Sequence, residues 1–321
     1  MYESPNSVVS TKLFTKKSFS AGARLGIAFV LIPTIDFILY SIVGLLVYET
    51  PLGSIYTNNY YISNVVLTFA MTILTVGIAF LITDRPKLPP LKRQLSTPTN
   101  QLPFSLNDFL IFFVMMYAVS VFANMLSPIF FTATIGESAP VPKHLKDQSA
   151  PYINAIYAVI VAPIIEEWTI RGFIFRPLER FGSTIAVVVS AIYFGVMHGN
   201  YYQIFYAIPV GLILGGAMAK YHSLFFNICL HAFYNWFERA SGLMFEFGNF
   251  VETIWIYVLV SIIFAGGLFL IITLYNLYKS RNNRPNNANQ LFSPKQLLVN
   301  PAFLGGFIIY IAIIYVTEIA P

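Results

Sequence analysis

The apolar run Ala155–Ile165 (AIYAVIVAPII) continues directly into the stretch Glu166-Glu167-Trp168-Thr169-Ile170-Arg171-Gly172. Two adjacent carboxylates and a guanidinium therefore stand at the end of a segment that is apolar enough to lie in a bilayer. An ionisable group at membrane depth costs at least about 2.5–3.5 kcal/mol on insertion scales, so such groups usually face the interior of a helix bundle and mark a functional site. This stretch therefore indicates both a membrane-embedded helix bundle and a functional site within it.

The composition is typical of an integral membrane protein. Of the 321 residues, 57% are hydrophobic and only 10% are charged, whereas about 25% of residues are charged in soluble proteins. The single cysteine, Cys229, excludes an intramolecular disulfide and a cysteine metal cluster. The net charge of +5 comes mainly from residues in loops, so it indicates membrane topology and not nucleic-acid binding.

We expect an all-α, polytopic bundle of eight or nine transmembrane helices. A cytoplasmic N-terminus places sixteen of the nineteen lysines and arginines on the cytoplasmic side, as the positive-inside rule requires. The stretches long enough to cross about 30 Å of hydrocarbon are Leu25–Tyr48, Ile62–Thr83, Phe109–Ile135, Tyr152–Phe175, Thr184–His198, Ile204–Ala219, Leu224–Trp236, Ile254–Tyr278 and Phe303–Ile319.

The same pattern divides the chain into four parts. They are a cytoplasmic N-terminal segment (1–24), N-terminal transmembrane helices (25–135), a core with the ionisable residues (152–238), and C-terminal transmembrane helices (254–319). Cytoplasmic loops at 84–107 and 280–301 are rich in Pro, Ser, Thr or Asn, which predicts flexible connectors with turn chemistry.

The two glutamates have different expected roles. Glu167 precedes Arg171 by four residues, the favourable order for an ion pair on one helix face. Glu166 lies about 100° away around the helix and lacks such a partner. We therefore predict that Glu166 activates water as a general base, with Glu167 and Arg171 in a supporting role. The residues alone leave open that both glutamates only pair with Arg171 to hold helices together.

Two later spans supply matching polar residues. His198 follows Phe194 by four residues, and His231 and Asn235 are four apart on one helical stripe. Each alone would more often be a satisfied core residue. Together with Glu166 they can converge in the middle of the bilayer, and such a set suits peptide hydrolysis. Glu166 and His198 would handle the proton of water, while His231 and Asn235 would donate to the oxyanion.

A zinc site is the rival interpretation. We expect no cofactor, but Glu166, His198 and His231 form a two-histidine, one-carboxylate set compatible with zinc and an open water position. The metalloprotease motif HExxH is absent, because Gly199 and Asn200 follow His198. Neither a GxSxG motif nor a GxGD motif occurs, which disfavours serine and aspartyl intramembrane proteases.

Three motifs resemble those of the CAAX-protease and bacteriocin-processing family, also called the Abi family. They are Glu166-Glu167-x-x-x-Arg171, Phe194-x-x-x-His198 and His231-x-x-x-Asn235. Gly172 and the stretch Tyr221–Phe225 also fit, whereas Ile170 stands where the family often has Phe. The resemblance covers Ala155–Glu238, about a quarter of the chain.

The resemblance implies a membrane-embedded helical bundle with endopeptidase activity. Family members cleave prenylated C-termini in eukaryotes, or peptides and membrane proteins in bacteria, where several act in bacteriocin maturation or self-immunity. Carried over by motif, Glu166 is the activating glutamate, His198 is its partner, and His231 and Asn235 serve the oxyanion.

The abundance of Ile, Asn, Phe and Tyr is typical of an AT-rich bacterial genome. It favours a bacterial cell membrane and a substrate that is not prenylated. The expected partners are then a membrane-associated peptide or protein and the lipid bilayer, without nucleic acid. A non-catalytic immunity or binding protein on the same scaffold is the alternative. A transporter is a weaker one: Asp36 and the glutamates could relay protons, but the sequence has no internal repeat.

Overall fold

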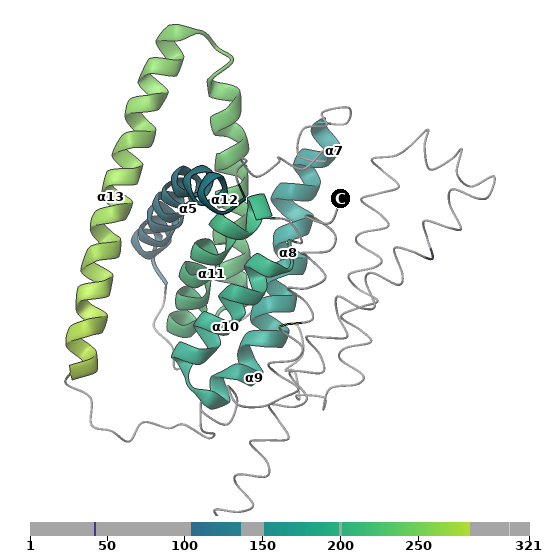
Figure 1. The fold of residues 1–321 in the computed structure, drawn as a ribbon, viewed down its shortest axis with the longest axis vertical. Helices are drawn as coiled ribbons and strands as arrows, with labels where there is room; N and C mark the ends of the chain where they lie inside the picture. The colour runs from purple at the N-terminus through teal and green to yellow at the C-terminus, as the bar shows by residue number, and fades with distance from the viewer. Residues whose placement is uncertain (1–41, 43–103, 136–150, 199–200, 283–307, 309–321) are drawn as a thin grey trace, which may run out of the picture. The chain divides into compact units, whose positions relative to one another are not determined.

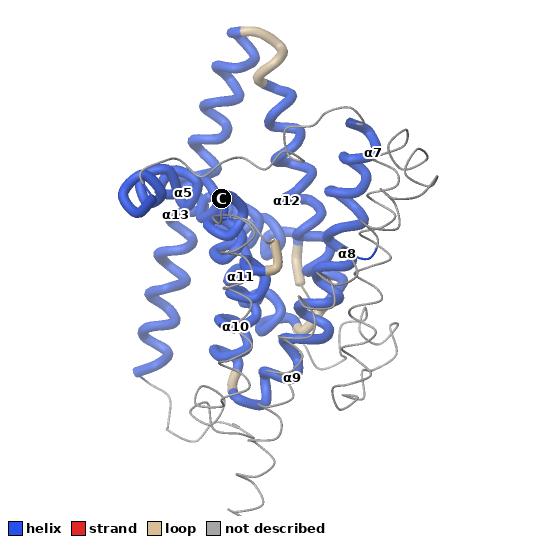
Figure 2. The backbone as a smooth tube through the Cα atoms, turned by 45° about the vertical axis from the view of Figure 1, so that its right-hand side comes forward, coloured by secondary structure: helices blue, strands red, loops and turns tan. Residues whose placement is uncertain are grey.

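The computed structural model describes residues 42, 104–135, 151–198, 201–282 and 308. Every secondary-structure element in these residues is helical (Figure 2). The number of spans and the orientation of the chain stay predictions, because several of the expected features lie wholly or almost wholly outside the described residues. These are the segments 1–24, 25–48, 62–83, 84–107, 280–301 and 303–319, and Asp36.

The chain separates into two compact units. One comprises 88–175 and 187–288 and carries all the predicted site residues. The other comprises 1–87, 176–186 and 289–321. Its described part is chiefly α9 (Arg176–Leu178) and the short helix η3 (Glu179–Phe181). The chain turns after η3 at Gly182, whose φ of 117° lies in a region that favours glycine.

Four long helices frame the site-bearing unit. α5 contacts each of the other three, and α12 and α13 form a hairpin (Figure 1). Each of the four covers one expected span and extends it by several residues at one or both ends. Their bounds are α5 Leu106–Ile135, α11 Tyr201–Tyr221, α12 Leu224–Met244 and α13 Asn249–Asn282. A shorter apolar helix, α10 (Ser183–Val196), precedes α11.

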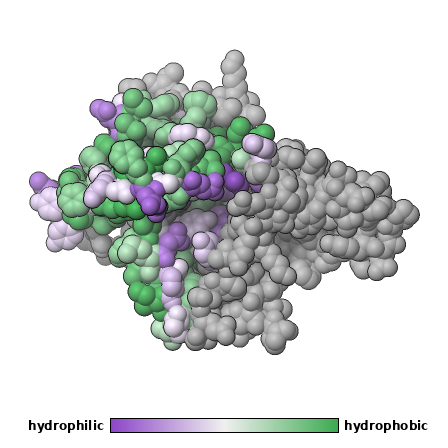
Figure 3. Space-filling model, turned by 90° about the horizontal axis from the view of Figure 1, so that it is seen from above, coloured by the Kyte–Doolittle hydropathy of each residue, from purple (hydrophilic) through white to green (hydrophobic). Residues whose placement is uncertain are grey.

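Three of the described helices are long and apolar enough to cross a membrane. They are Leu106–Ala133, Tyr202–Tyr221 and Asn249–Lys279, and only 6% of the most apolar part of the last is buried. Such exposure suits contact with lipid. α12 is less apolar because Asn227, His231 and Asn235 recur along it every four residues. Viewed from above, hydrophilic side chains gather in a band across the largely hydrophobic described surface (Figure 3).

The expected span Tyr152–Phe175 is helical throughout but not uniformly α-helical. It consists of α7, the π turn η1, α8 and a second π turn η2, with bounds Pro151–Ile156, Tyr157–Val161, Ala162–Glu167 and Trp168–Phe175. Glu166 and Glu167 close the short α-helical piece between the two π turns. η1 has five residues, about one π turn, and single π turns within α-helices often occur at functional sites; η2, with eight residues, is longer than one turn.

Two local features position α10, α11 and α12: one lets α10 and α11 pack closely, and the other shapes the turn from α11 to α12. A Cβ atom on Gly211 of α11 would lie 3.0 Å from the Cα of Ala191 on α10, so this glycine permits close contact of the two backbones. The chain turns between α11 and α12 at His222 and Ser223. His222 has a φ of 48°, and the Ser223 hydroxyl accepts a hydrogen bond from the N–H of Phe226, which caps the start of α12.

Candidate active site

The predicted ion pair between Glu167 and Arg171 is present and completely buried. Arg171 Nη1 lies 2.9 Å from Glu167 Oε1, and neither side chain is exposed. Arg171 also donates from Nη2 to the main-chain oxygen of Gly211 at 3.0 Å, and its guanidinium carbon lies 4.8 Å from the centre of the Phe194 ring. One side chain thus ties the glutamate helix to α11 and α10. Arginine is always protonated, so Glu167 beside it is a carboxylate.

Sequence reasoning missed Asn227, the third side chain bound to Glu167. Its Nδ2 donates to Glu167 Oε2 at 3.3 Å and to the main-chain oxygen of Leu214 at 2.7 Å. Asn227 is fully buried and lies four residues before His231 on α12. Continuing the His231-x-x-x-Asn235 spacing one turn toward the N-terminus would have found it.

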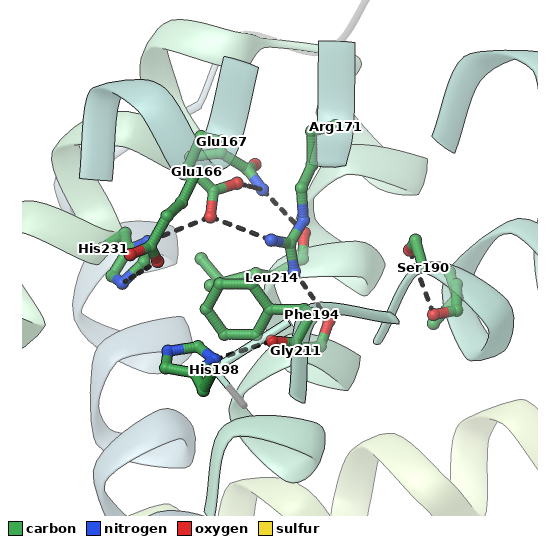
Figure 4. Close-up of polar contacts among 11 residues, drawn as sticks. Glu166, Glu167, Arg171, Ser190, Phe194, His198, Gly211, Leu214 and His231 are labelled. Atoms are coloured by element: carbon green, nitrogen blue, oxygen red, sulfur yellow. Dashed lines mark hydrogen bonds and ion pairs between the residues drawn. The ribbon is translucent and has the colours of Figure 1, made fainter. Parts of the chain in front are cut away.

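His231 stands between the two glutamates (Figure 4). Its Nδ1 lies 3.0 Å from Glu167 Oε1, and its Nε2 lies 3.8 Å from Glu166 Oε2. Because a carboxylate only accepts hydrogen bonds, Nδ1 carries a proton, and Nε2 is the nitrogen turned to Glu166. The sequence predicted that His231 lies near Glu166, but it paired Glu167 with Arg171 alone. The structure brings His231 to both.

The two carboxylates lie in different environments. The Glu166 side chain is 21% exposed, whereas that of Glu167 is not exposed at all and is bound by Arg171, Asn227 and His231. The 3.8 Å between Glu166 and His231 exceeds a hydrogen-bond length, but one water molecule can bind to both groups across such a gap. Glu167 is therefore suited to holding Arg171, Asn227 and His231 in place. Glu166 is suited to contacting a water molecule or a substrate.

His198 lies in the turn that follows α10 and is anchored to it. Its Nδ1 is 2.7 Å from the main-chain oxygen of Phe194. A carbonyl only accepts, so Nδ1–H donates this hydrogen bond. The Phe194 ring makes edge-to-face contacts with both His198 and His231, at centroid distances of 5.1 and 5.5 Å. The motif spacing Phe194-x-x-x-His198 therefore corresponds to a direct contact.

Asn235 is placed one turn after His231 on α12 and contacts the glutamate helix. Its Nδ2 donates to the main-chain oxygen of Ala158 in η1 at 2.8 Å, and the side chain is partly buried. One of its two amide protons is thus engaged by the protein itself.

The expected zinc ligands Glu166, His198 and His231 stay a prediction. Within the part of the chain that the structure describes, no three His, Cys, Asp or Glu side chains are grouped so as to hold a metal ion. Glu166, His198 and His231 all belong to that part.

Comparison with protein families identifies the segment that holds this site. Residues 148–237 match the family described as type II CAAX prenyl endopeptidase Rce1-like. The match agrees with the CAAX-protease resemblance of the three motifs, spans somewhat more than a quarter of the chain, and contains every predicted site residue from Glu166 to Asn235. Comparisons with curated proteins and with solved structures found no match.

Proposed function

We propose, from the Rce1-like segment at residues 148–237, that this protein is an integral-membrane endopeptidase. It hydrolyses a peptide bond in a membrane-associated peptide or protein by glutamate-activated water. The observation that carries the proposal is the position of His231, 3.0 Å from the buried Glu167 and 3.8 Å from the partly exposed Glu166. If Glu167 only held helices together, His231 would not need the partly exposed carboxylate of Glu166 beside its other ring nitrogen.

Glu166 is the general base. A water molecule bound between its Oε2 and His231 Nε2 loses a proton to Glu166 as the water oxygen attacks the scissile carbonyl carbon. His198 assists this proton transfer, as the family resemblance implies. Glu167 takes no proton, since Arg171 and His231 both bind the same oxygen of its carboxylate. Its role is to hold the imidazole of His231 in one orientation.

His231 and Asn235 stabilise the tetrahedral intermediate. With Nδ1–H committed to Glu167, a proton on Nε2 makes the ring an imidazolium, and Glu167 remains its negatively charged neighbour after Glu166 has taken the proton of water. Its Nε2–H donates to the oxyanion, and the second amide proton of Asn235 adds a further donor. Glu166 then returns its proton to the leaving nitrogen and the C–N bond breaks, which gives a carboxylic acid and an amine. The new acid passes its remaining proton to water, so Glu166 ends the cycle as a carboxylate.

This mechanism needs no metal, and a chelator tests that point. Peptide cleavage by purified protein should be unchanged by 1,10-phenanthroline. Loss of cleavage that is restored by added Zn²⁺ would instead assign zinc to Glu166, His198 and His231, with zinc supplying an activated water.

The biological setting that we propose is peptide processing or bacteriocin self-immunity in a bacterial cell membrane. The test compares the peptide termini present in membranes and medium of cells that carry wild type or Glu166→Ala at equal expression. Glu246→Ala is the matched control, because Glu246 is an exposed glutamate in the turn after α12. Termini that occur with wild type and Glu246→Ala, but not with Glu166→Ala, would establish proteolysis and identify the substrate.

Identical termini in all three strains would overturn the peptidase proposal. If a resistance phenotype also persisted with Glu166→Ala, the protein would act as a non-catalytic immunity or binding protein on a protease scaffold.

A further inference from the structure

The main-chain oxygen of Ala158 lacks the donor that a helix normally provides. Its partner would be the N–H of residue 162 in an α-helix or that of residue 163 in a π turn. The N–H of Ala162 donates to Tyr157, which closes η1, and Pro163 has no N–H. Both standard donors are therefore unavailable to this oxygen.

A side chain from α12 takes their place. Asn235 Nδ2 lies 2.8 Å from the Ala158 oxygen, although the two residues are 77 positions apart in the chain. An unpaired carbonyl in a buried or membrane environment costs free energy. Because Pro163 has no N–H, the Asn235 amide donates to the Ala158 carbonyl in its place. The contact joins the helix that carries Glu166 to the helix that carries His231.

We propose that Asn235 is a positioning residue, whose amide holds the Pro163-interrupted helix against α12 and so sets the distance between Glu166 and His231. The effect on catalysis rests on the peptidase function proposed above, whereas the structural link between Asn235 and Pro163 does not. This role differs from oxyanion binding. The amide nitrogen carries two protons, and the one bound to Ala158 fixes the orientation of the other.

The geometry explains why such a link matters. Glu166 lies eight residues after Ala158 on the same helical segment, and His231 lies one turn before Asn235 on α12. At a separation of 3.8 Å, His231 Nε2 and Glu166 Oε2 can both bind one water molecule that lies to the side of the line joining them. A displacement of about 1 Å between the two helices can lower a catalysed rate about a hundredfold.

A double-mutant cycle tests the proposal. The variants are Asn235→Ala, Pro163→Ala and the two combined, each assayed for kcat and for thermal unfolding in detergent. Alanine at position 163 provides an N–H that can donate to the Ala158 carbonyl. The hydrogen bond from Asn235 to Ala158, which we call the tether, is then no longer needed. We expect Asn235→Ala to lower kcat about a hundredfold in the native background. The loss should be about tenfold smaller when Pro163 is also replaced, within the range of coupling in one hydrogen-bond network.

Pro209→Ala provides the matched control, because Pro209 also interrupts a membrane helix but lies in α11. Asn235→Ala should lower kcat by the same factor whether or not Pro209 is also replaced by alanine. If the Asn235→Ala loss is also the same in the Pro163→Ala background, Asn235 serves the oxyanion alone and the positioning proposal is overturned.

Two further outcomes are decisive. If Asn235→Ala fails to fold, the double variant with Pro163→Ala should restore folded protein, and failure to do so would refute the tether. If Glu166→Ala shows that the protein is not a peptidase, the coupling must still be present in the unfolding temperatures. The failure of the peptidase proposal and that of the tether can therefore be told apart.

Discussion

His231 Nδ1 lies 3.0 Å from Oε1 of Glu167, the same oxygen that Arg171 binds at 2.9 Å. In hydrolases with a carboxylate–histidine pair, the carboxylate fixes the tautomer and the orientation of the imidazole. Glu167 is placed to do the same here, because its other oxygen is also held, by Asn227. The adjacent glutamates therefore differ in their contacts: Glu167 binds Nδ1 of His231, and Glu166 faces Nε2 of the same ring.

This division predicts that activity and stability respond separately to the two glutamates. Glu166→Gln should lower kcat by about 10²–10⁴-fold, the usual contribution of a general base. Its thermal unfolding should change little, because the Glu166 side chain is partly exposed and its closest ion-pair contact is 3.8 Å. Turnover of the substrate found by terminus analysis, measured together with the unfolding temperature, checks both parts. Full turnover by Glu166→Gln would rule out this base.

Glu167→Ala should strongly destabilise the protein. Removing this carboxylate leaves the guanidinium of Arg171 buried without its counter-ion, a change that costs about 3–5 kcal/mol in proteins. Denaturant unfolding in detergent measures the loss. Lys220→Met is the control: the Lys220–Asp108 pair is 3.1 Å long, but its side chains are 45% and 26% exposed. Losing such a pair costs at most about 1 kcal/mol. Equal destabilisation by the two variants would contradict the assigned role of Glu167.

The sequence predicted the features of the site that depend on local spacing. Helical periodicity is enough to pair Glu167 with Arg171 and to put His231 and Asn235 on one stripe. Hydropathy is enough to locate α5, α11 and α13, because each is a long apolar run. The functional roles of these residues, and the spans outside the described residues, stay predictions.

The remaining features depend on contacts between distant residues or on a change of helix type. Asn227 reaches Glu167 across 60 residues, and Arg171 binds a main-chain oxygen 40 residues away. No periodicity within one helix reports such contacts. The π turns η1 and η2 add residues to a turn, so angles of 100° per residue do not hold through them. The position of Pro163 was a signal of irregularity, but it did not indicate which residue would satisfy the carbonyl left unpaired.

Arg171→Lys should not preserve the site, although it keeps the charge. The guanidinium binds Glu167 through Nη1 and the Gly211 oxygen through Nη2, whereas an ammonium group is a compact point charge without this fork. One of the two buried acceptors is left unpaired, which costs about 1–3 kcal/mol. We expect lower stability and lower kcat than wild type, with a smaller stability loss than in Arg171→Ala. Wild-type unfolding and turnover for Arg171→Lys would mean that charge alone suffices.

We expect the hydrogen bond from Arg171 to the Gly211 oxygen to require the close spacing of α10 and α11. Alanine at Gly211 would bring its Cβ to 3.0 Å from the Ala191 Cα and 3.1 Å from Phe194 Cδ1. Because the first of these is a backbone atom, the helices must separate, which weakens the bond from Arg171 to the Gly211 oxygen. We expect Gly211→Ala to lose about 1–3 kcal/mol of stability, as overpacked sites do, and to lose activity.

Gly216 provides the comparison, since a Cβ there would meet nothing within 4 Å on the same helix. Gly216→Ala should be neutral or should stabilise the protein by up to about 1 kcal/mol, because alanine is the better helix former. Thermal unfolding and turnover of both variants, expressed in parallel, measure the difference. If Gly211→Ala matched Gly216→Ala in both assays, the close approach of α10 and α11 would have no part in holding Arg171. Arg171 would then be held by its bond to Glu167, without a contribution from the spacing of the two helices.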